Sequence, residues 1–333
     1  MTPVRRTATA GRSGAFVRTV LGDIPPQRLG RTDYHEHLFQ VSPLLPGDEL
    51  DDEEASGAEA AMLGAAGIDA LVEATPLGLG RDPAASARVA ETSGLNVVAT
   101  TGCHRQGHYR EGDPLLALTE EGLVELFLRD LTEEAAEAGS GTEVGAGTGS
   151  GGSPVRAGLL KAGVGYWSVS PFEHRVLAAV AAAHRMTGAP VMVHLEHGSA
   201  AFEVLEILDS WGVPASSVAL AHADRNPDPV LHAELCATGC YLGYDGMARH
   251  RTLPDSAVLD CLVRTVGKVG PDRLLLGGDV ARRTRYRAYG GMPGLDYLPT
   301  RFLPRVRAEL GDGVLAAILG ANPAAWLSWP STP

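Results

Sequence analysis

Short, mostly apolar segments recur eight times along this chain, and each is followed by polar residues and then by a stretch with helical character. They occupy residues 28–37, 68–75, 95–103, 157–165, 190–196, 218–224, 240–246 and 273–279. Their apolar residues are mostly consecutive rather than alternating, which is typical of parallel strands buried on both faces. Strands that alternate with helical stretches of about 10–15 residues indicate βα units. Eight such units predict an α/β fold, the (β/α)8 TIM barrel, with a doubly wound open sheet as the alternative.

The chain is expected to form one barrel domain over residues 18–330, after an N-terminal tail over residues 1–17. The stretch from about residue 133 to 153 reads EEAAEAGSGTEVGAGTGSGGS and predicts a flexible surface insertion, because it is rich in Gly, Ser and Thr. It contains a G-x-G-x-x-G pattern at residues 147–152. Nucleotide-binding glycines follow a strand and precede a helix, and neither is predicted here.

The charge balance and the hydrophobicity exclude several classes of protein. Asp and Glu total 40 against 28 Lys plus Arg, which gives a net charge of −12 and argues against binding to nucleic acid or an anionic membrane surface. No apolar run approaches the ~20 residues that span a bilayer, and the N-terminal residues lack the apolar core of a secretory signal. The four cysteines are expected to be reduced thiols in a cytoplasmic protein.

Side chains that can bind a metal stand at the ends of four of the predicted strands. His35 and His37 lie two residues apart, so that both imidazoles point to the same side of an extended strand. His194, His222 and Asp279 end three later strands. Each residue alone could be structural, and a single histidine after an apolar run more often is. Their joint occurrence where barrels place functional groups favours a metal centre.

Lys161 lies inside an apolar predicted strand, although only two of the 28 cationic residues of this chain are lysines. A free ammonium would be costly there because it loses its hydration. Three interpretations compete: a structural lysine that extends its amine to water, a Schiff-base lysine, and an amine carboxylated by CO2 that bridges two metal ions. The nearby histidines favour the third, because a Schiff-base enzyme needs no metal cluster.

Seven segments of the chain occur in the order found in one known family. They read TVLGDI, DYHEHLF, LLKAGVGY, VMVHLEHG, AHADRNPDP, GGDVARR and YGGMPGLDYLPTRFLP, and they lie between residues 18 and 329. Because of these segments, the sequence resembles the phosphotriesterase-related branch of the amidohydrolase superfamily. The short segment over residues 279–291 is more similar to the phosphotriesterase homology proteins than to dedicated phosphotriesterases.

The resemblance implies a binuclear metal centre in a distorted barrel of the metal-dependent hydrolase type. The more buried ion would be held by His35, His37 and Asp279, the more exposed ion by His194 and His222, and both by carboxylated Lys161. Zinc is the expected metal, with manganese or cobalt as alternatives. A hydroxide between the ions would attack a carboxylic ester, lactone, amide or phosphoester, with promiscuous phosphotriesterase activity. Asp279 would accept the proton of the hydroxide, and His222 or Asp224 could pass it on.

Contacts to a small-molecule substrate are expected from residues that follow the strands. The candidates are Arg225, Tyr244, His197, Tyr109 and Arg282, and His104 and His108 are expected at the mouth of the site. The seventh strand ends in Asp245, where lactonase members typically have an arginine. Two alternatives stay open, a non-catalytic small-molecule-binding barrel and a Schiff-base lyase that uses Lys161. The family often forms dimers, so a homodimer is also expected.

Overall fold

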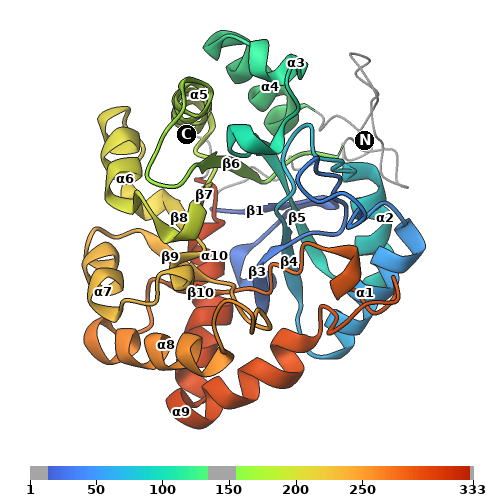
Figure 1. Cartoon of the computed structure of the whole chain (residues 1–333), viewed down its shortest axis with the longest axis vertical. Coiled ribbons are helices and arrows are strands. Elements are labelled where there is room, and N and C mark those ends of the chain that lie inside the picture. The colour runs from blue at the N-terminus through green and yellow to red at the C-terminus, as the bar shows by residue number, and fades with distance from the viewer. Residues whose placement is uncertain (1–13, 134–154, 331–333) are drawn as a thin grey trace, which may run out of the picture.

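The structure, a computed structural model, describes residues 14–133 and 155–330. Its centre is one sheet of eight parallel strands, in the order in which they follow one another along the chain (Figure 1). The strands are β3 (Thr32–Glu36), β4 (Ala70–Glu73), β5 (Asn96–Gly102), β6 (Leu159–Val164), β7 (Val191–Leu195), β8 (Val218–Ala221), β9 (Tyr241–Tyr244) and β10 (Leu274–Leu276). Each lies within one of the eight predicted segments.

The first and last strands of this sheet are joined beyond the end of β10. The backbone N–H of Asp279 donates to the carbonyl of His35 at 2.9 Å, and the N–H of Gly278 donates to Asp33 Oδ1 at 3.2 Å. These bonds bring β10 against β3 and close the sheet. The predicted (β/α)8 TIM barrel is therefore confirmed, and the open-sheet alternative is wrong.

Helices surround the barrel between successive strands (Figure 1). They are α1 (Glu53–Ala65), α2 (Pro83–Ser93), α3 (Pro114–Ala117), α4 (Glu120–Thr132), α5 (Pro171–Thr187), α6 (Ala201–Ser210), α7 (Pro229–Ala237), α8 (Asp255–Val269), α9 (Leu303–Ala316) and α10 (Asn322–Trp326). Several begin at a side chain that accepts a hydrogen bond from a free backbone N–H of the first turn. Asp52, Asp82, Thr119 and Ser170 do so for α1, α2, α4 and α5.

The amino ends of the strands are closed by the two ends of the described chain. The hairpin of β1 (Val17–Thr19) and β2 (Gly22–Ile24) follows Phe16, whose ring stacks on Trp329 at 5.8 Å. The indole N–H of Trp329 donates to the carbonyl of Gly158, just before β6, and that of Trp326 donates to Val191 in β7. Residues 1–13 of the expected tail and nearly all of the expected insertion lie outside the described residues.

Two sets of buried apolar side chains make up the core. The smaller set fills the inside of the barrel and includes Ala70, Val98, Leu159, Met192 and Leu275. The larger set fills the layer between the strands and the helices. The four cysteines are free and buried, as predicted for reduced thiols. Within the described ranges, no helix combines the length and apolar composition that crossing a bilayer requires.

Candidate metal and active site

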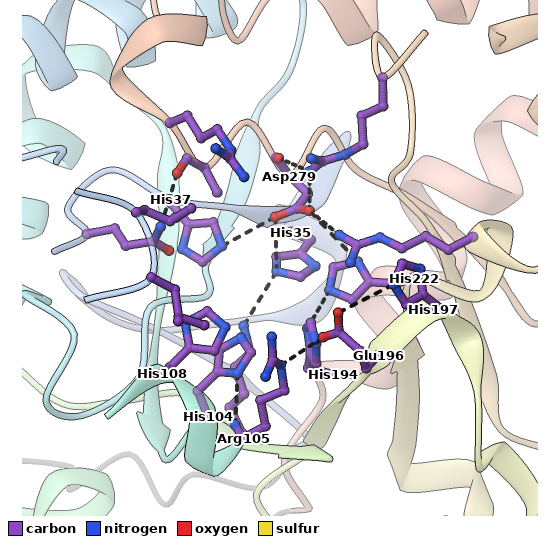
Figure 2. A pocket seen from close by; sticks show the side chains of 18 of the residues that line it. His35, His37, His104, Arg105, His108, His194, Glu196, His197, His222 and Asp279 are labelled. Atoms are coloured by element: carbon purple, nitrogen blue, oxygen red, sulfur yellow. Dashed lines mark hydrogen bonds and ion pairs between the residues drawn. The ribbon is translucent and has the colours of Figure 1, made fainter. Parts of the chain in front are cut away.

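A cavity of about 470 Å³ opens at the carboxyl end of the barrel strands (Figure 2). Its wall contains all six residues that the sequence indicates as metal ligands, which are His35, His37, Lys161, His194, His222 and Asp279. Five elements that are far apart in the sequence bring them together. All six are buried. Their placement agrees with the rule that barrel enzymes gather functional groups at this end of the sheet.

Two of the six residues adopt an unusual backbone conformation. His222 directly follows β8 with a φ of 65°, and Asp279 lies three residues after β10 with a φ of 45°. Few residues other than glycine occupy this left-handed region, and such strain is concentrated at functional sites. At both places the chain turns sharply as it leaves its strand, and the turn aims the side chain into the cavity.

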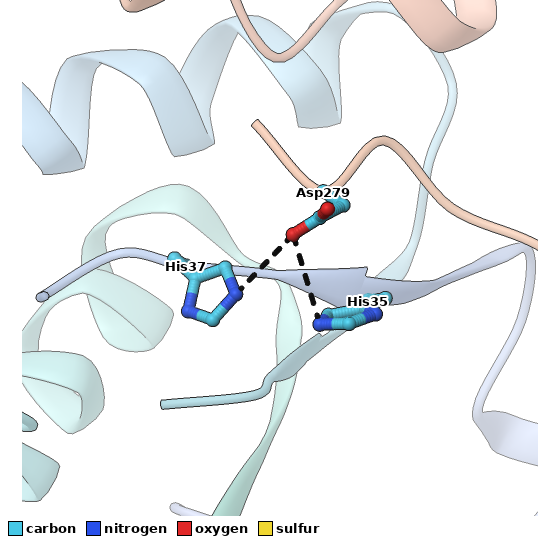
Figure 3. A group of neighbouring side chains, drawn as sticks. All are labelled: His35, His37 and Asp279. Carbon is cyan, nitrogen blue, oxygen red and sulfur yellow. Dashed lines mark ion pairs between the residues drawn. The ribbon is translucent and has the colours of Figure 1, made fainter. Parts of the chain in front are cut away.

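His35, His37 and Asp279 form the first group of donor atoms (Figure 3). Asp279 Oδ1 lies 3.8 Å from His35 Nε2 and 3.5 Å from His37 Nε2. The three residues each offer a ligand atom, and these atoms lie within 4.8 Å of one another. Imidazole nitrogen and carboxylate oxygen are ligands that zinc and similar divalent ions accept.

His194 and His222 form the second group, with His194 Nδ1 2.8 Å from His222 Nε2. Lys161 lies between the two groups in the chain, and its Nζ is 3.5 Å from His35 Nε2 and donates to the carbonyl of Ala74 at 2.7 Å. Burial lowers the pKa of Lys161 to about 8. A larger share of its amine is therefore uncharged at neutral pH than in an exposed lysine, and only the uncharged amine can react with CO2.

The outward-facing nitrogen of three of these imidazoles is held by a carboxylate. Asp245 binds two of them, with Oδ1 2.7 Å from His222 Nδ1 and Oδ2 3.1 Å from His35 Nδ1. The hydroxyl of Tyr34 also donates to Asp245. Glu196 Oε2 lies 3.0 Å from His194 Nε2. A carboxylate in this position fixes the ring orientation and directs the lone pair of the other nitrogen toward the cavity.

The fourth imidazole, His37, is held by a hydroxyl, with its Nδ1 2.7 Å from Thr75 Oγ1. Burial lowers the pKa of all four imidazoles, to about 4 for His35. The rings are therefore neutral at pH 7, and each keeps a lone pair that can bind an ion. The donor set of this structure fits divalent metal ions.

Asp279 is ionised although it is buried. Burial alone would raise its pKa, but Arg249 and His35, followed by His37 and His222, lower it well below its usual value. Its two oxygens face different partners. Oδ1 faces the imidazoles of the first group, whereas Oδ2 accepts hydrogen bonds from Arg249 and from Arg225 at 2.9 Å.

The residues that the sequence indicates as substrate contacts divide into two groups. Arg225, His197 and Arg282 line the cavity. Tyr244 and Tyr109 do not. The hydroxyl of Tyr244 lies 2.6 Å from His232 Nδ1 on the side of the barrel wall that faces the helices, and the hydroxyl of Tyr109 donates to the carbonyl of Leu77.

Other polar residues of the cavity were not indicated as site residues by the sequence. These are Gln40, Arg105, Glu196, Arg249 and Thr252, and Asp245 lies directly behind the wall. Asp245 could have been recognised in the sequence, because it is a carboxylate at the end of an apolar predicted strand, as Asp279 is. Glu196 could have been recognised as well, because it ends the predicted strand over residues 190–196 two positions after His194, on the same side of an extended chain. The remaining four lie outside the predicted strands, where no periodicity indicates the direction of a side chain.

The fold and the site define a barrel enzyme, a hydrolase of the phosphotriesterase and lactonase type. The chain belongs to the Phosphotriesterase family, which matches residues 15–327 and confirms the family that the sequence resembles.

Relatives cover nearly the whole chain. It is 30% identical to a phospho-furanose lactonase of Mycoplasmopsis synoviae, over 88% of this chain and 85% of that one. It is 27% identical to the human N-acetyltaurine hydrolase, over 94% and 98% of the two chains. The crystal structure of a lactonase from Listeria monocytogenes has a TM-score of 0.82 and 30% identity, over 94% of this chain and 98% of that one.

Proposed function

We propose that this protein is a binuclear metal-dependent hydrolase that cleaves a small anionic lactone, carboxylic ester or amide. The observation that carries the proposal is the fixation of four neutral imidazoles, each by its outward-facing nitrogen, around one cavity. Binuclear centres are general in the family to which the chain belongs, which supports two ions here. His35, His37 and Asp279 would hold one, and His194 and His222 the other.

Two divalent ions, of which zinc is the first candidate, would supply a Lewis acid and lower the pKa of a water molecule. The residues around them have separate tasks. Carboxylation would turn the side chain of Lys161 from a buried cation into an anion that lies between the two groups of metal donors. Asp279 accepts the proton that the attacking water loses, because it is ionised and reaches the cavity. His222 could pass this proton on only if the proton on its own Nδ1 moved to Asp245, since that nitrogen lies 3.8 Å from Asp279 Oδ2 but 2.7 Å from Asp245 Oδ1.

The charge of the cavity supports an anionic substrate. Four guanidinium groups line it against two carboxylates, in a chain whose net charge is −12. The guanidinium groups belong to Arg105, Arg225, Arg249 and Arg282. A positive cavity in a negative protein selects and attracts anions, and planar guanidinium groups bind phosphate, sulfonate and carboxylate oxygens well. The names of two relatives, a phospho-furanose lactonase and an N-acetyltaurine hydrolase, describe substrates of this charge.

Three of the residues that the sequence indicates are suited to contact this substrate. The His197 side chain is 60% exposed and that of Arg282 47% exposed, so both can meet a substrate as it enters. Arg225 lies deeper, beside Asp279. We propose these three, with Arg249, as the contacts of the anionic group.

A hydrolysis screen of the purified, metal-analysed protein tests the proposal. It compares phosphorylated sugar lactones and N-acyltaurines with uncharged lactones and amides of similar size, and includes a phosphotriester. We expect about two divalent ions per chain and a kcat/KM at least tenfold higher for the anionic compounds, with weak triester hydrolysis. Protein that binds no transition metal and hydrolyses none of these compounds after addition of zinc or manganese contradicts the proposal.

The lowered pKa of Lys161 also suits a Schiff-base lyase, and this is the alternative function. Borohydride reduction in the presence of a carbonyl compound would trap such an intermediate on Lys161, whereas a hydrolase gives no adduct. Binding of an anionic lactone without turnover would instead indicate a non-catalytic barrel. Two further expectations, a homodimer and a cytoplasmic location, remain proposals that gel filtration and cell fractionation test.

A further inference from the structure

Two histidines that belong to neither group of metal donors lie in the wall of the cavity. His104 and His108 follow β5, and their ring centroids are 3.7 Å apart. The ring of His104 also lies 4.3 Å from that of His194. In Figure 2 both rings are on the side of the cavity away from Asp279. This side is next to the second group of donor atoms.

Hydrogen bonds fix the tautomer of His104. Its Nδ1 lies 2.8 Å from the backbone N–H of Arg105, which can only donate. Nδ1 is therefore unprotonated, and the single ring proton is on Nε2. Nδ1 of the neighbouring His108 lies 3.0 Å from Ser42 Oγ. A hydroxyl can donate or accept, so this contact holds the His108 ring in place and leaves its tautomer open.

The Nε2–H group of His104 is thus a donor without a protein acceptor. Among the described residues, none forms a hydrogen bond to Nε2 of His104 or His108. Both residues line the cavity, which makes a bound molecule the available acceptor.

The segment that carries His104 is anchored from several directions. The hydroxyl of Tyr109 accepts from the N–H of His104 at 2.8 Å while it donates to Leu77. The N–H of Gln106 donates to Glu173 Oε1 at 2.9 Å. Tyr109, a residue that the sequence suggests as a substrate contact, therefore positions the segment.

A glycine in the neighbouring strand permits this arrangement. A Cβ atom on Gly163 of β6 would lie 2.7 Å from the backbone nitrogen of Arg105 and 3.3 Å from His104 Nδ1. Any side chain at this position would push His104 away from the strand. The orientation of the His104 ring thus depends on Leu77 in the loop after β4, on Gly163 of β6 and on Glu173 of α5.

We infer that His104 is a catalytic hydrogen-bond donor, whose Nε2–H binds the leaving oxygen or nitrogen of the substrate, with His108 as its support. The inference rests on the proposed hydrolase function. The carbonyl of the substrate would lie near the metal donors, and its anionic group near the arginines. His104, beside His194, is then close to the bond that breaks. As that bond breaks, negative charge develops on the leaving atom, and a fixed N–H stabilises it.

The reaction balances without a change in the protonation of His104. The oxygen of water forms a bond to the carbonyl carbon, and the bond from that carbon to the leaving atom breaks with its electron pair. Asp279 takes one proton from the water, and that proton ends on the leaving atom. His104 keeps its proton throughout and only shares it in a hydrogen bond.

A series of aryl esters with leaving groups of graded pKa tests this role. Each ester carries a carboxylate on its acyl side. For His104→Ala we expect kcat to fall by about 100-fold for the most basic leaving groups, as is typical when one such donor is removed, and by much less for the most acidic. His104→Gln, which keeps an N–H donor, should recover part of the loss. His250→Ala, an exposed histidine outside the cavity, is the matched control and should follow the native enzyme.

Metal content, measured on every variant, separates this role from damage to the site. We expect His104→Ala to retain the ions of the native protein. Gly163→Ala, with His104 intact but displaced, should reproduce the steeper dependence on leaving-group pKa. An equal loss across the series, or a change in KM alone, overturns the inference but leaves the hydrolase proposal standing. Failure of the metal-loaded native protein to hydrolyse any lactone, ester or amide overturns both.

Discussion

Nζ of Lys161 lies 3.5 Å from Nε2 of His35, and the two side chains are buried together at the carboxyl end of the barrel. A protonated lysine this close to a metal ligand would repel a divalent ion. The contact therefore favours a lysine that is uncharged or carboxylated when ions are bound.

The first prediction concerns this lysine. Lys161→Ala should bind fewer than two divalent ions per chain and lose more than about 100-fold in kcat/KM, which exceeds the usual effect of residues behind the ligands. Lys161→Arg should be as inactive, because a guanidinium cannot be carboxylated. Metal analysis and steady-state kinetics measure both effects, and Lys268→Ala, at the other lysine, is the matched control. Native metal content in Lys161→Ala and in His35→Ala would contradict the bridged centre.

Asp245 should be needed for both ions. Asp245→Asn replaces an acceptor oxygen by an NH₂ group that faces an imidazole N–H, of either His35 or His222. We expect a loss of about 10–100-fold in the affinity for each ion, which is typical of outer partners of ligating histidines. Calorimetric titration of metal-free protein measures this. Asp272→Asn, on the surface, is the control and should leave both affinities unchanged. If Asp245→Asn kept the native affinity for one of the two ions, this carboxylate would serve the other ion only.

Gly243 should be irreplaceable in β9. A Cβ atom there would lie 1.9 Å from the hydroxyl of Tyr34, so that Gly243→Ala must displace the tyrosine from Asp245. We expect a destabilisation of about 1–3 kcal/mol from overpacking, together with weaker metal binding. Urea unfolding measures the first effect. Gly267→Ala, in α8 where a Cβ meets nothing within 4 Å, should be neutral or slightly stabilising. Equal stability of both variants would argue against a close contact.

His232 should reduce stability at acidic pH. Its Nε2 faces the carbonyl of Ala223 at 3.0 Å, so that Nδ1 is the acceptor for Tyr244, and burial lowers its pKa from 6.5. Below pH 6.5 the unfolded chain takes up a proton that the folded chain refuses, and folding is penalised. The native protein should lose stability relative to His232→Gln by up to about 1.4 kcal/mol per pH unit below 6.5. Unfolding free energies of the two proteins between pH 7.5 and 5 measure this difference. Parallel curves would mean that the ring protonates freely.

The strands of the barrel could be predicted because their apolar segments are short and evenly distributed. The candidate ligands could be predicted because each stands at or just beyond the end of such a segment, where barrels gather their functional groups. His222 is instructive. Alternation from Ala221 would turn it away from the inside of the barrel, and only the left-handed turn at His222 directs it inward. Its position at the end of a predicted strand therefore identified His222 as a site residue, whereas the side-chain direction expected from strand alternation would have excluded it.

Tyr244 shows where the prediction from sequence fails. Tyr241 and Gly243 face the inside of the barrel, so that Tyr244 points to the helices and Asp245 points in. Strict alternation along β9 would have selected Asp245 instead of Tyr244. No such rule could have found Arg249, which reaches Asp279 from a loop whose course depends on a left-handed residue, Ala248.

The two oxygens of Asp245 bind one histidine from each group of metal donors. Rotation of this carboxylate therefore moves His35 and His222 together, and neither group can become ordered alone. The first ion to arrive would set the geometry that the second one meets. The two ions should consequently bind cooperatively. The fraction of loaded protein should rise more steeply with metal concentration than it would for two independent sites, and little of the protein should carry a single ion.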